Sequence, residues 1–147
     1  MSASSLAAGL AIAIAAVTLS ACNEVETETA VGYEPAKLED VAGKGDDVKR
    51  IVLTREGASR VDLRTGEVGR SGGRASVPYA ALLYDEEGAT FVYTQTKPLS
   101  YLRVPVKVER VENGRVLLNA GPPVGTKVVT VGTAEVYGVE QEVAGSH

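Results

Sequence analysis

The sequence predicts an all-β fold, a small antiparallel β-barrel or sandwich with one short helix. The clearest observation is a period of two over Leu102–Glu109. Val104, Val106 and Val108 share one face of this segment and polar residues share the other. A second observation is the Asn113-Gly114 pair, the preferred two-residue turn of a β-hairpin. The third is composition: 44% of residues are hydrophobic, mainly Val, Leu and Ala, with no Trp and one Phe. This composition favours a small β core over an aromatic-lined ligand pocket.

The first predicted strand of this domain runs over Val48–Leu53. Thr54 follows it and is a preferred N-cap residue, so a short helix is expected from there to about Arg60. A second strand is expected over Val61–Val68. Gly69–Arg74 contains three glycines and is expected to be a loop.

Two further strands are expected over Val77–Tyr84 and Thr90–Thr96. The polar turn Asp85–Gly88 between them ends in glycine, which indicates a hairpin. In the alternating segment, Pro105 lacks an N–H, so this strand is expected at a sheet edge or with that position facing outward. The remaining expected elements are a return strand at Arg115–Asn119, a turn at Gly121–Gly125, a last strand at Thr126–Val131 and a helical turn at Thr133–Tyr137.

The N-terminus carries an apolar run from Leu6 to Leu19 that ends in Leu19-Ser20-Ala21-Cys22, and Cys22 is the sole cysteine. The run has the length of a signal-peptide core and is shorter than the roughly 20 residues of a membrane-spanning helix. This arrangement resembles the lipobox of bacterial lipoprotein precursors. The resemblance implies cleavage before Cys22 and acylation of its thiol. Met1–Ser5 lacks the usual positive charge, so an uncleaved helix and an ordinary secretory signal remain alternatives.

The chain is therefore expected to have four parts. Residues 1–21 form the signal peptide, and their removal leaves 126 of the 147 residues, enough for one domain. Residues 22–47 form a flexible acidic tether, because a polar sequence without a sustained period buries too little surface to fold alone. A strand at 24–31 is the weaker alternative for that segment. Residues 48–139 form the β domain, and residues 140–147 form a loose C-terminal tail.

Charge argues against a nucleic-acid partner. The formal net charge is −4 and the isoelectric point is about 5.1. An acidic domain has no general attraction for nucleic acid and is mildly repelled by anionic lipid headgroups. Membrane attachment is therefore expected to depend on acyl chains, in an extracytoplasmic location in a bacterial envelope.

No set of residues indicates catalysis, a cofactor or a metal, and the protein is expected not to be an enzyme. The single thiol excludes an internal disulfide and a cysteine metal cluster. Gly121–Lys127 is one residue short of a phosphate-binding loop, and two prolines remove N–H donors from it. His147 is the last residue, and Ser71 has no base nearby in sequence.

Two groups of polar residues have simpler structural interpretations. Asp85, Glu86 and Glu87 could hold a cation, but a solvated turn is the stronger interpretation of three adjacent carboxylates. The tyrosines on or beside predicted strands are expected to be half-buried wall residues with hydrated hydroxyls. They are Tyr79, Tyr84, Tyr93 and Tyr101.

Several weak motifs, in order, resemble the periplasmic adaptor family of efflux pumps, also called membrane fusion proteins. The entry strand is Val77-Pro78-Tyr79-Ala80-Ala81-Leu82-Leu83, followed by the acidic turn and Phe91-Val92-Tyr93. Then come Arg103–Val108, the hairpin that continues through Arg115-Val116, and the block Gly121–Gly132. The segment from Ile51 to Val68 resembles the piece that precedes the long insert of these adaptors. The similarity covers about residues 48–138.

The resemblance implies a small β-barrel like the membrane-proximal domain of these adaptors, with the loop Gly69–Arg74 in place of the insert. The insert would hold a helical hairpin, a lipoyl-like domain and a second barrel, and the sequence has none of these. Export activity therefore does not carry over, and only docking on a transporter permease or an adaptor protein is implied. The alternative is a cell-envelope binding module for a wall polymer, peptide or small ligand.

Overall fold

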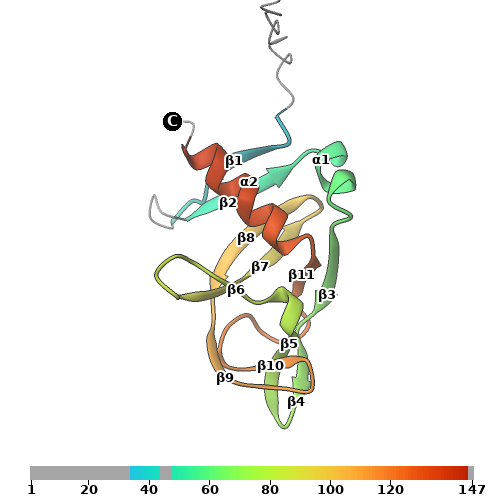
Figure 1. The fold of residues 1–147 in the computed structure, drawn as a ribbon, viewed down its shortest axis with the longest axis vertical. Coiled ribbons are helices and arrows are strands. Elements are labelled where there is room, and N and C mark those ends of the chain that lie inside the picture. Colours follow the sequence, from blue (N-terminus) through green and yellow to red (C-terminus); the bar gives the residue numbers. More distant parts are fainter. Residues whose placement is uncertain (1–33, 44–47, 146–147) are drawn as a thin grey trace, which may run out of the picture. The chain divides into compact units, whose positions relative to one another are not determined.

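The computed structural model describes residues 34–43 and 48–145, and these form one antiparallel, mostly β structure (Figure 1). The expected signal peptide, Cys22, the alternative strand at 24–31 and His147 lie outside the described residues. The strands are β1 (Ala36–Asp40), β2 (Lys49–Leu53), β3 (Arg64–Glu67), β4 (Gly69–Ser71), β5 (Arg74–Pro78), β6 (Leu83–Tyr84), β7 (Thr90–Lys97), β8 (Ser100–Pro105), β9 (Lys107–Glu112), β10 (Arg115–Ala120) and β11 (Lys127–Val131). The helices are α1 (Arg55–Arg60), the 3-10 turn η1 (Tyr79–Ala81) and α2 (Thr133–Gly145).

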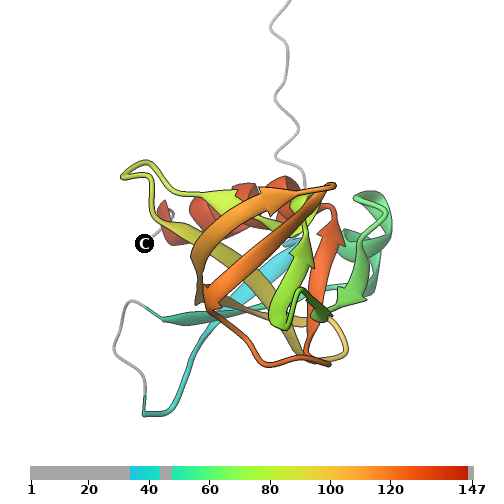
Figure 2. The ribbon, with the colours of Figure 1, turned by 90° about the horizontal axis from the view of Figure 1, so that it is seen from below.

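The strands form two sheets. One has the order β1-β2-β8-β7-β11-β3, with β6 paired to β7, and the other has the order β4-β5-β10-β9. Every strand pair is antiparallel. The all-β prediction is confirmed, and the sandwich-like arrangement applies, because the sheets do not close into a barrel. Seen from below, α2 lies along one side of the strands (Figure 2).

Two chain segments pass directly from one sheet to the other. Val68 separates β3 from β4, and its N–H donates to the Thr126 carbonyl over 2.8 Å. Val106 separates β8 from β9, and its N–H donates to the Thr90 carbonyl over 2.9 Å. The single strand expected over 102–109 is therefore two strands. Its predicted facing still holds at the crossing point, where Val106 is buried and Lys107 is exposed.

An aliphatic core fills the space between the two sheets. It contains side chains from both sheets, and most of its members are valines. Most of these valines lie on strands, where the side chains at alternate positions face the other sheet. Its buried members are Val68, Val77, Ala81, Leu82, Val92, Val106, Val116, Leu118 and Val128.

A second, partly aromatic core lies on the other face of the seven-stranded sheet, beneath α2. Its buried members are Ala36, Ile51, Leu53, Phe91, Tyr93, Tyr101, Val129 and Val136, with Tyr137 and Val139 packed against it. The helical turn predicted at Thr133–Tyr137 is shorter than the helix that the structure contains. The helix α2 continues to Gly145, through most of the expected loose tail, because Val136, Tyr137 and Val139 bury one side of it against the sheet.

The expected flexible tether also contains structure. Strand β1 lies within it and pairs with β2, so that Ala36 is opposite Leu53 and Asp40 is opposite Lys49. Ala36 is buried and Leu38 packs on the aromatic core. The strand was not predicted because this segment is mainly polar. Its partner β2 contributes the larger buried residues, Ile51 and Leu53.

The helix α1 begins as predicted. The Thr54 side chain accepts a hydrogen bond from the Gly57 N–H over 3.0 Å, which satisfies one of the free donors of the first turn. The predicted Asn113-Gly114 turn is also confirmed: it joins β9 to β10, and both residues have positive φ, 51° and 72°.

Two predicted segments differ in detail. Gly69–Arg74 is not a loop but the hairpin β4–β5, turning at Gly72 and Gly73, whose φ values of 54° and 79° favour glycine. The strand expected over 77–84 is interrupted by η1. Pro78 precedes that turn, and the Leu82 N–H closes it on the Tyr79 carbonyl over 3.0 Å.

Candidate functional site

The acidic turn is a structural feature of the β6–β7 hairpin. One Asp85 side-chain oxygen accepts hydrogen bonds from the Glu87 N–H over 3.2 Å and the Ala89 N–H over 2.7 Å. The turn interpretation of Asp85, Glu86 and Glu87 accounts for these contacts. Within the described residues, no three His, Cys, Asp or Glu side chains come together as metal ligands.

The glycine-proline segment that followed β10 in the sequence is a turn. The Gly125 N–H donates to the Val68 carbonyl over 2.8 Å, and the Thr126 N–H donates to the Pro123 carbonyl over 3.1 Å. The first bond holds the turn against the crossing at Val68 and the second closes the turn on itself, so these N–H groups do not point at a shared anion as in a phosphate-binding loop. Ser71, the last residue of β4, lies in the β4–β5 hairpin.

The four tyrosines divide into two pairs: the prediction of half-buried rings holds for Tyr79 and Tyr84 and is wrong for Tyr93 and Tyr101. Tyr93 and Tyr101 are buried, with 0% and 2% exposure, in the aromatic core. Tyr79 and Tyr84 are 51% and 52% exposed. The burial of Tyr93 depends partly on α2, whose Glu140 accepts a hydrogen bond from the tyrosine hydroxyl.

A group of three polar side chains joins this aromatic core to α2. Arg103 of β8 donates to one Glu140 carboxylate oxygen from Nη2 over 2.9 Å and from Nε over 3.3 Å. The Tyr93 hydroxyl of β7 donates to the same oxygen. Both side chains of the ion pair are largely buried, with 29% and 13% exposure. We call Tyr93, Arg103 and Glu140 the helix clasp.

Aromatic rings surround the arginine of the helix clasp. Its guanidinium carbon lies 4.3 Å from the centre of the Phe91 ring and 5.2 Å from that of Tyr137. Phe91 in turn meets Tyr93 edge to face at 5.6 Å. Cation–π contacts of this kind are worth about 1 kcal/mol or more when partly desolvated. The rings therefore help offset the cost of taking the Arg103 charge out of water.

The surroundings of the helix clasp raise the pKa values of its two proton donors, Tyr93 and Arg103. Burial, and then the neighbouring Glu140 carboxylate, raise the pKa of Tyr93 well above its usual range. Burial alone would lower the pKa of Arg103, but the charge and hydrogen bonds of Glu140 raise it overall. Tyr93 therefore stays a neutral donor and Arg103 stays a cation across the physiological pH range. The geometry suits a fixed contact between helix and sheet better than acid–base chemistry.

Two shallow hollows of about 230 and 200 Å³ flank the helix clasp. Both are bordered by Asp85 and Arg103, so each carries charges of both signs. The contact between Tyr93, Arg103 and Glu140 was not predicted from the sequence. Its one available signal was the spacing of Val136, Val139 and Glu140, which places them on neighbouring positions of one helix face.

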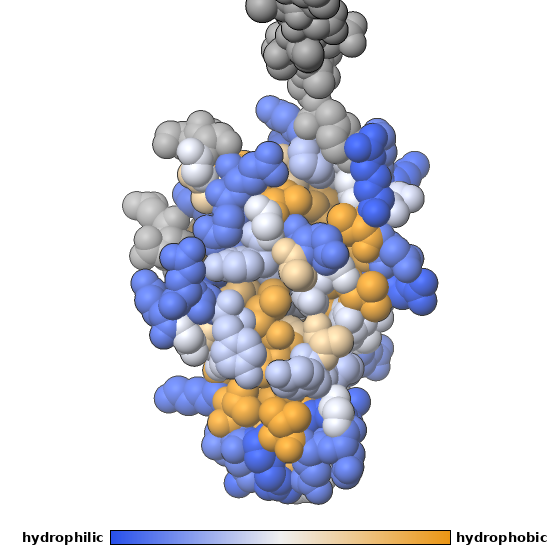
Figure 3. Space-filling model, viewed as in Figure 1, coloured by the Kyte–Doolittle hydropathy of each residue, from blue (hydrophilic) through white to orange (hydrophobic). Residues whose placement is uncertain are grey.

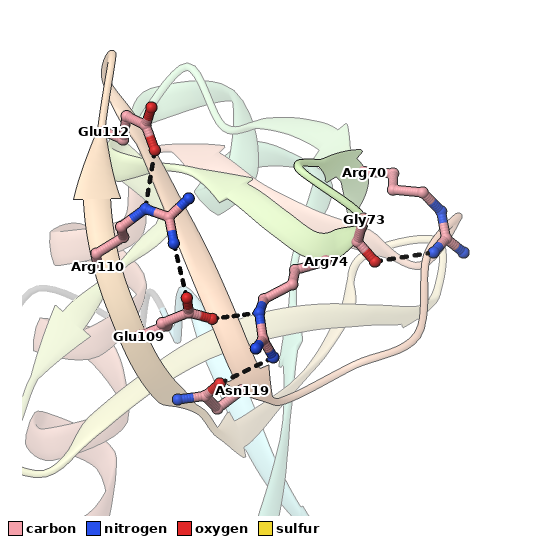
Figure 4. Close-up of polar contacts among 7 residues, drawn as sticks. All are labelled: Arg70, Gly73, Arg74, Glu109, Arg110, Glu112 and Asn119. Atoms are coloured by element: carbon pink, nitrogen blue, oxygen red, sulfur yellow. Dashed lines mark hydrogen bonds and ion pairs between the residues drawn. The ribbon is translucent and has the colours of Figure 1, made fainter.

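The outer face of the four-stranded sheet carries a chain of paired charges, drawn in Figure 4. Arg110 donates to Glu109 over 2.7 Å and to Glu112 over 2.9 Å. Glu109 also pairs with Arg74, which donates to the Asn119 side-chain oxygen over 3.1 Å. The other side chains of these ion pairs are about half exposed, whereas Glu109 is 23% exposed. The two arginines and two glutamates balance in charge, and pairs with exposed partners contribute little stability.

Exposed apolar residues gather near η1. Tyr79 and Val111 are each 51% exposed, and the Tyr79 N–H donates to the Gly114 carbonyl of the β9–β10 hairpin over 2.9 Å. Ala80 is also exposed, and its carbonyl accepts a hydrogen bond from the Thr133 hydroxyl at the start of α2. Apolar surface is visible in the lower part of the face in Figure 3, below α2. We call Tyr79, Ala80 and Val111 the η1 surface.

Comparisons with protein-family models, curated proteins and solved structures found no match. None of the helices in the described part of the chain is long and apolar enough to cross a membrane.

Proposed function

We propose that the protein is a non-catalytic, lipid-anchored module of the bacterial envelope that docks on a transporter permease or an adaptor protein. The anchor is the acylated Cys22, as the resemblance of Leu19-Ser20-Ala21-Cys22 to a lipobox implies. Two or three acyl chains give stable membrane attachment, whereas one chain is marginal. Glu34, where the described residues begin, follows Cys22 by twelve residues, so the module stays within about 40 Å of the membrane.

The observation that carries the docking proposal is how the chain halves join at the β4–β5 hairpin. The segments before and after Gly72-Gly73 contribute to the same two sheets and the same aliphatic core. This is the arrangement that the adaptor resemblance implies when the long insert is replaced by a short connection. The η1 surface supports the proposal as a contact site, because exposed tyrosine is enriched in protein interfaces and Val111 adds exposed apolar surface.

Crosslinking in intact membranes, followed by pull-down of the full-length protein, tests this proposal. We expect a permease or adaptor subunit to be captured by the wild type. Capture should fall in the Tyr79→Ser/Val111→Ser variant and persist in Tyr84→Ser, whose parent side chain is equally exposed. Recovery of wall-synthesis proteins in place of transport proteins, or equal capture by the three forms, contradicts the proposal.

A second candidate function is an envelope binding module for a peptide, a wall polymer or a small ligand. One observation favours it, a hollow beside the β4–β5 hairpin that is lined by arginines. A ligand there would not require the η1 surface, so the two functions can be tested separately.

A further inference from the structure

A hollow of about 380 Å³ lies between the tip of the β4–β5 hairpin and the turn that follows β10. It is larger than either hollow beside the helix clasp. Its wall contains two arginines and no carboxylate, in a protein with a net charge of −4. The lining residues are Arg70, Gly73, Arg74, Ala75, Leu118, Asn119, Ala120, Gly121, Pro122, Pro123 and Val124.

Arg70 is held in place but keeps most of its donors. Its Nη1 donates to the Gly73 carbonyl over 3.2 Å, across the tip of its own hairpin. A guanidinium has five N–H donors, so this contact orients the group and leaves the others for a ligand. Arg74 has fewer donors left for a ligand, because its guanidinium already pairs with Glu109 and donates to Asn119. Figure 4 shows the two arginines leaving the hairpin on opposite sides.

The lining of the hollow is mixed, and it includes accessible apolar residues. Leu118 is 4% exposed, Pro122 is buried and Ala75 is half-buried, while Val124 is exposed at the rim. This combination suits a ligand that has a small aliphatic body and one anionic group.

The walls of the hollow are set before any ligand binds. The turn beyond β10 contains Pro122-Pro123, and its C-terminal end is tied to Val68 by two hydrogen bonds, through Gly125 and Thr126. Gly121 is closely packed, because a Cβ there would lie 3.0 Å from Leu118 and 3.1 Å from Val106. A preformed wall reduces the ordering cost of binding.

We infer that this hollow binds the free carboxylate end of a short peptide with small aliphatic side chains, with the Arg70 guanidinium as the carboxylate ligand. A planar guanidinium matches a carboxylate in a two-point contact, and the more accessible Ala75 and Val124 would contact the adjoining methyl groups. The inference deepens the second candidate function, on which it rests, and needs neither the lipid anchor nor the η1 surface.

The test is a titration of the full-length protein, in non-ionic detergent, with acetyl-alanyl-alanine, followed by NMR of the backbone amides. We expect a saturable change at Gly73, Gly121 and Val124, with a Kd of about 1 mM for so small a ligand. The same peptide with a C-terminal amide should bind at least about tenfold more weakly, because it lacks the charged hydrogen-bond acceptor.

Variants at the arginine separate this inference from general attraction to positive charge. Arg70→Gln and Arg70→Lys should each weaken binding about tenfold, since Lys keeps the charge but loses the two-point contact. Arg55→Gln, an exposed arginine on α1, is the matched control and should bind as the wild type does.

Three results would overturn the inference. They are equal binding of the acid and the amide, an unchanged Kd in Arg70→Gln, and inorganic phosphate binding as tightly as the peptide at the same amides. The crosslinking experiment reports on a protein partner and is unaffected by any of these results, so failure of the ligand site is distinguishable from failure of the docking proposal.

Discussion

The two faces of the seven-stranded sheet are buried in different ways. The face toward the second sheet packs aliphatic side chains such as Val92, Val106 and Val128, and its burial needs no polar partner. The face toward α2 packs Phe91 and aromatic neighbours around a buried ion pair and a tyrosine hydroxyl. The first core depends only on excluding water, whereas the second also depends on every polar group finding its partner.

A charge in the aliphatic core should have the largest effect. Val106 is 5% exposed, so Val106→Asp would bury a carboxylate without a partner and lower the free energy of unfolding by more than about 4 kcal/mol. Its neighbour Lys107 is exposed, and Lys107→Asp should cost less than about 1 kcal/mol. Urea denaturation measures both values. Equal losses in the two variants would show that the strand facing is wrong.

Breaking the helix clasp should have the next largest effect. Glu140→Leu leaves Arg103 partly buried and without its carboxylate, at an expected cost of about 2–3 kcal/mol. The double variant Arg103→Leu/Glu140→Leu removes both charges and should be more stable than Glu140→Leu, but less stable than the wild type, because the buried Tyr93 hydroxyl loses its acceptor. Denaturation followed by near-ultraviolet circular dichroism reports on the aromatic core. A double variant no more stable than Glu140→Leu would contradict the proposed role of the charge pair.

Alkaline pH should weaken the aromatic core through its tyrosines. Because the pKa of Tyr93 is raised in the folded protein, its contribution is complete below about pH 10 and is lost as the pH rises above that value. The unfolded chain then releases a proton that the folded chain keeps, so stability falls by about 1.4 kcal/mol per pH unit for this group. Tyr101 adds to the trend, since burial raises its pKa too.

Stability curves between pH 9 and pH 11 measure this effect. Tyr93→Phe should make the slope shallower than that of the wild type. An unaltered slope in Tyr93→Phe would mean that the Tyr93 hydroxyl ionises as readily in the folded protein as in the unfolded chain.

A Gly/Ser insertion after Gly72 should have the smallest effect. Gly72 and Gly73 are exposed at the hairpin tip, and loop closure entropy rises slowly with length, so a loss of about 1 kcal/mol is expected. Calorimetry should show one cooperative transition, because both cores contain residues from each side of the hairpin. Two separate transitions in the parent protein, or residues 75–147 folding alone with full stability, would contradict a single module.

The contrast between the two faces also explains what could be predicted from the sequence. The alternation around Val106, the Asn113-Gly114 turn and the Thr54 cap are local patterns, and they indicated the strands, the hairpin and the short helix. The aromatic core is assembled from distant parts. Arg103 and Glu140 are 37 residues apart, and no local period in either segment indicates that they meet.

The proposed ligand hollow also depends on residues that are distant in the sequence. Arg70 lies in a segment expected to be a loop, and its hollow exists only because that segment is a hairpin packed near the Pro122-Pro123 turn. Strand β1 was missed because a short acidic segment has little apolar surface of its own, and its pairing with β2 supplies the rest. Long-range pairing therefore creates both the second core and the proposed ligand site.

Lipid attachment at Cys22 is the claim on which the proposed envelope location and membrane docking depend, and intact mass measurement of the membrane-extracted protein tests it directly. For the wild type we expect a chain that begins at Cys22 and carries two or three acyl chains, and that partitions into detergent. Cys22→Ser should accumulate as an uncleaved or unlipidated precursor. If the Cys22→Ser protein shows the same mature mass and the same detergent partitioning as the wild type, the lipoprotein account is contradicted.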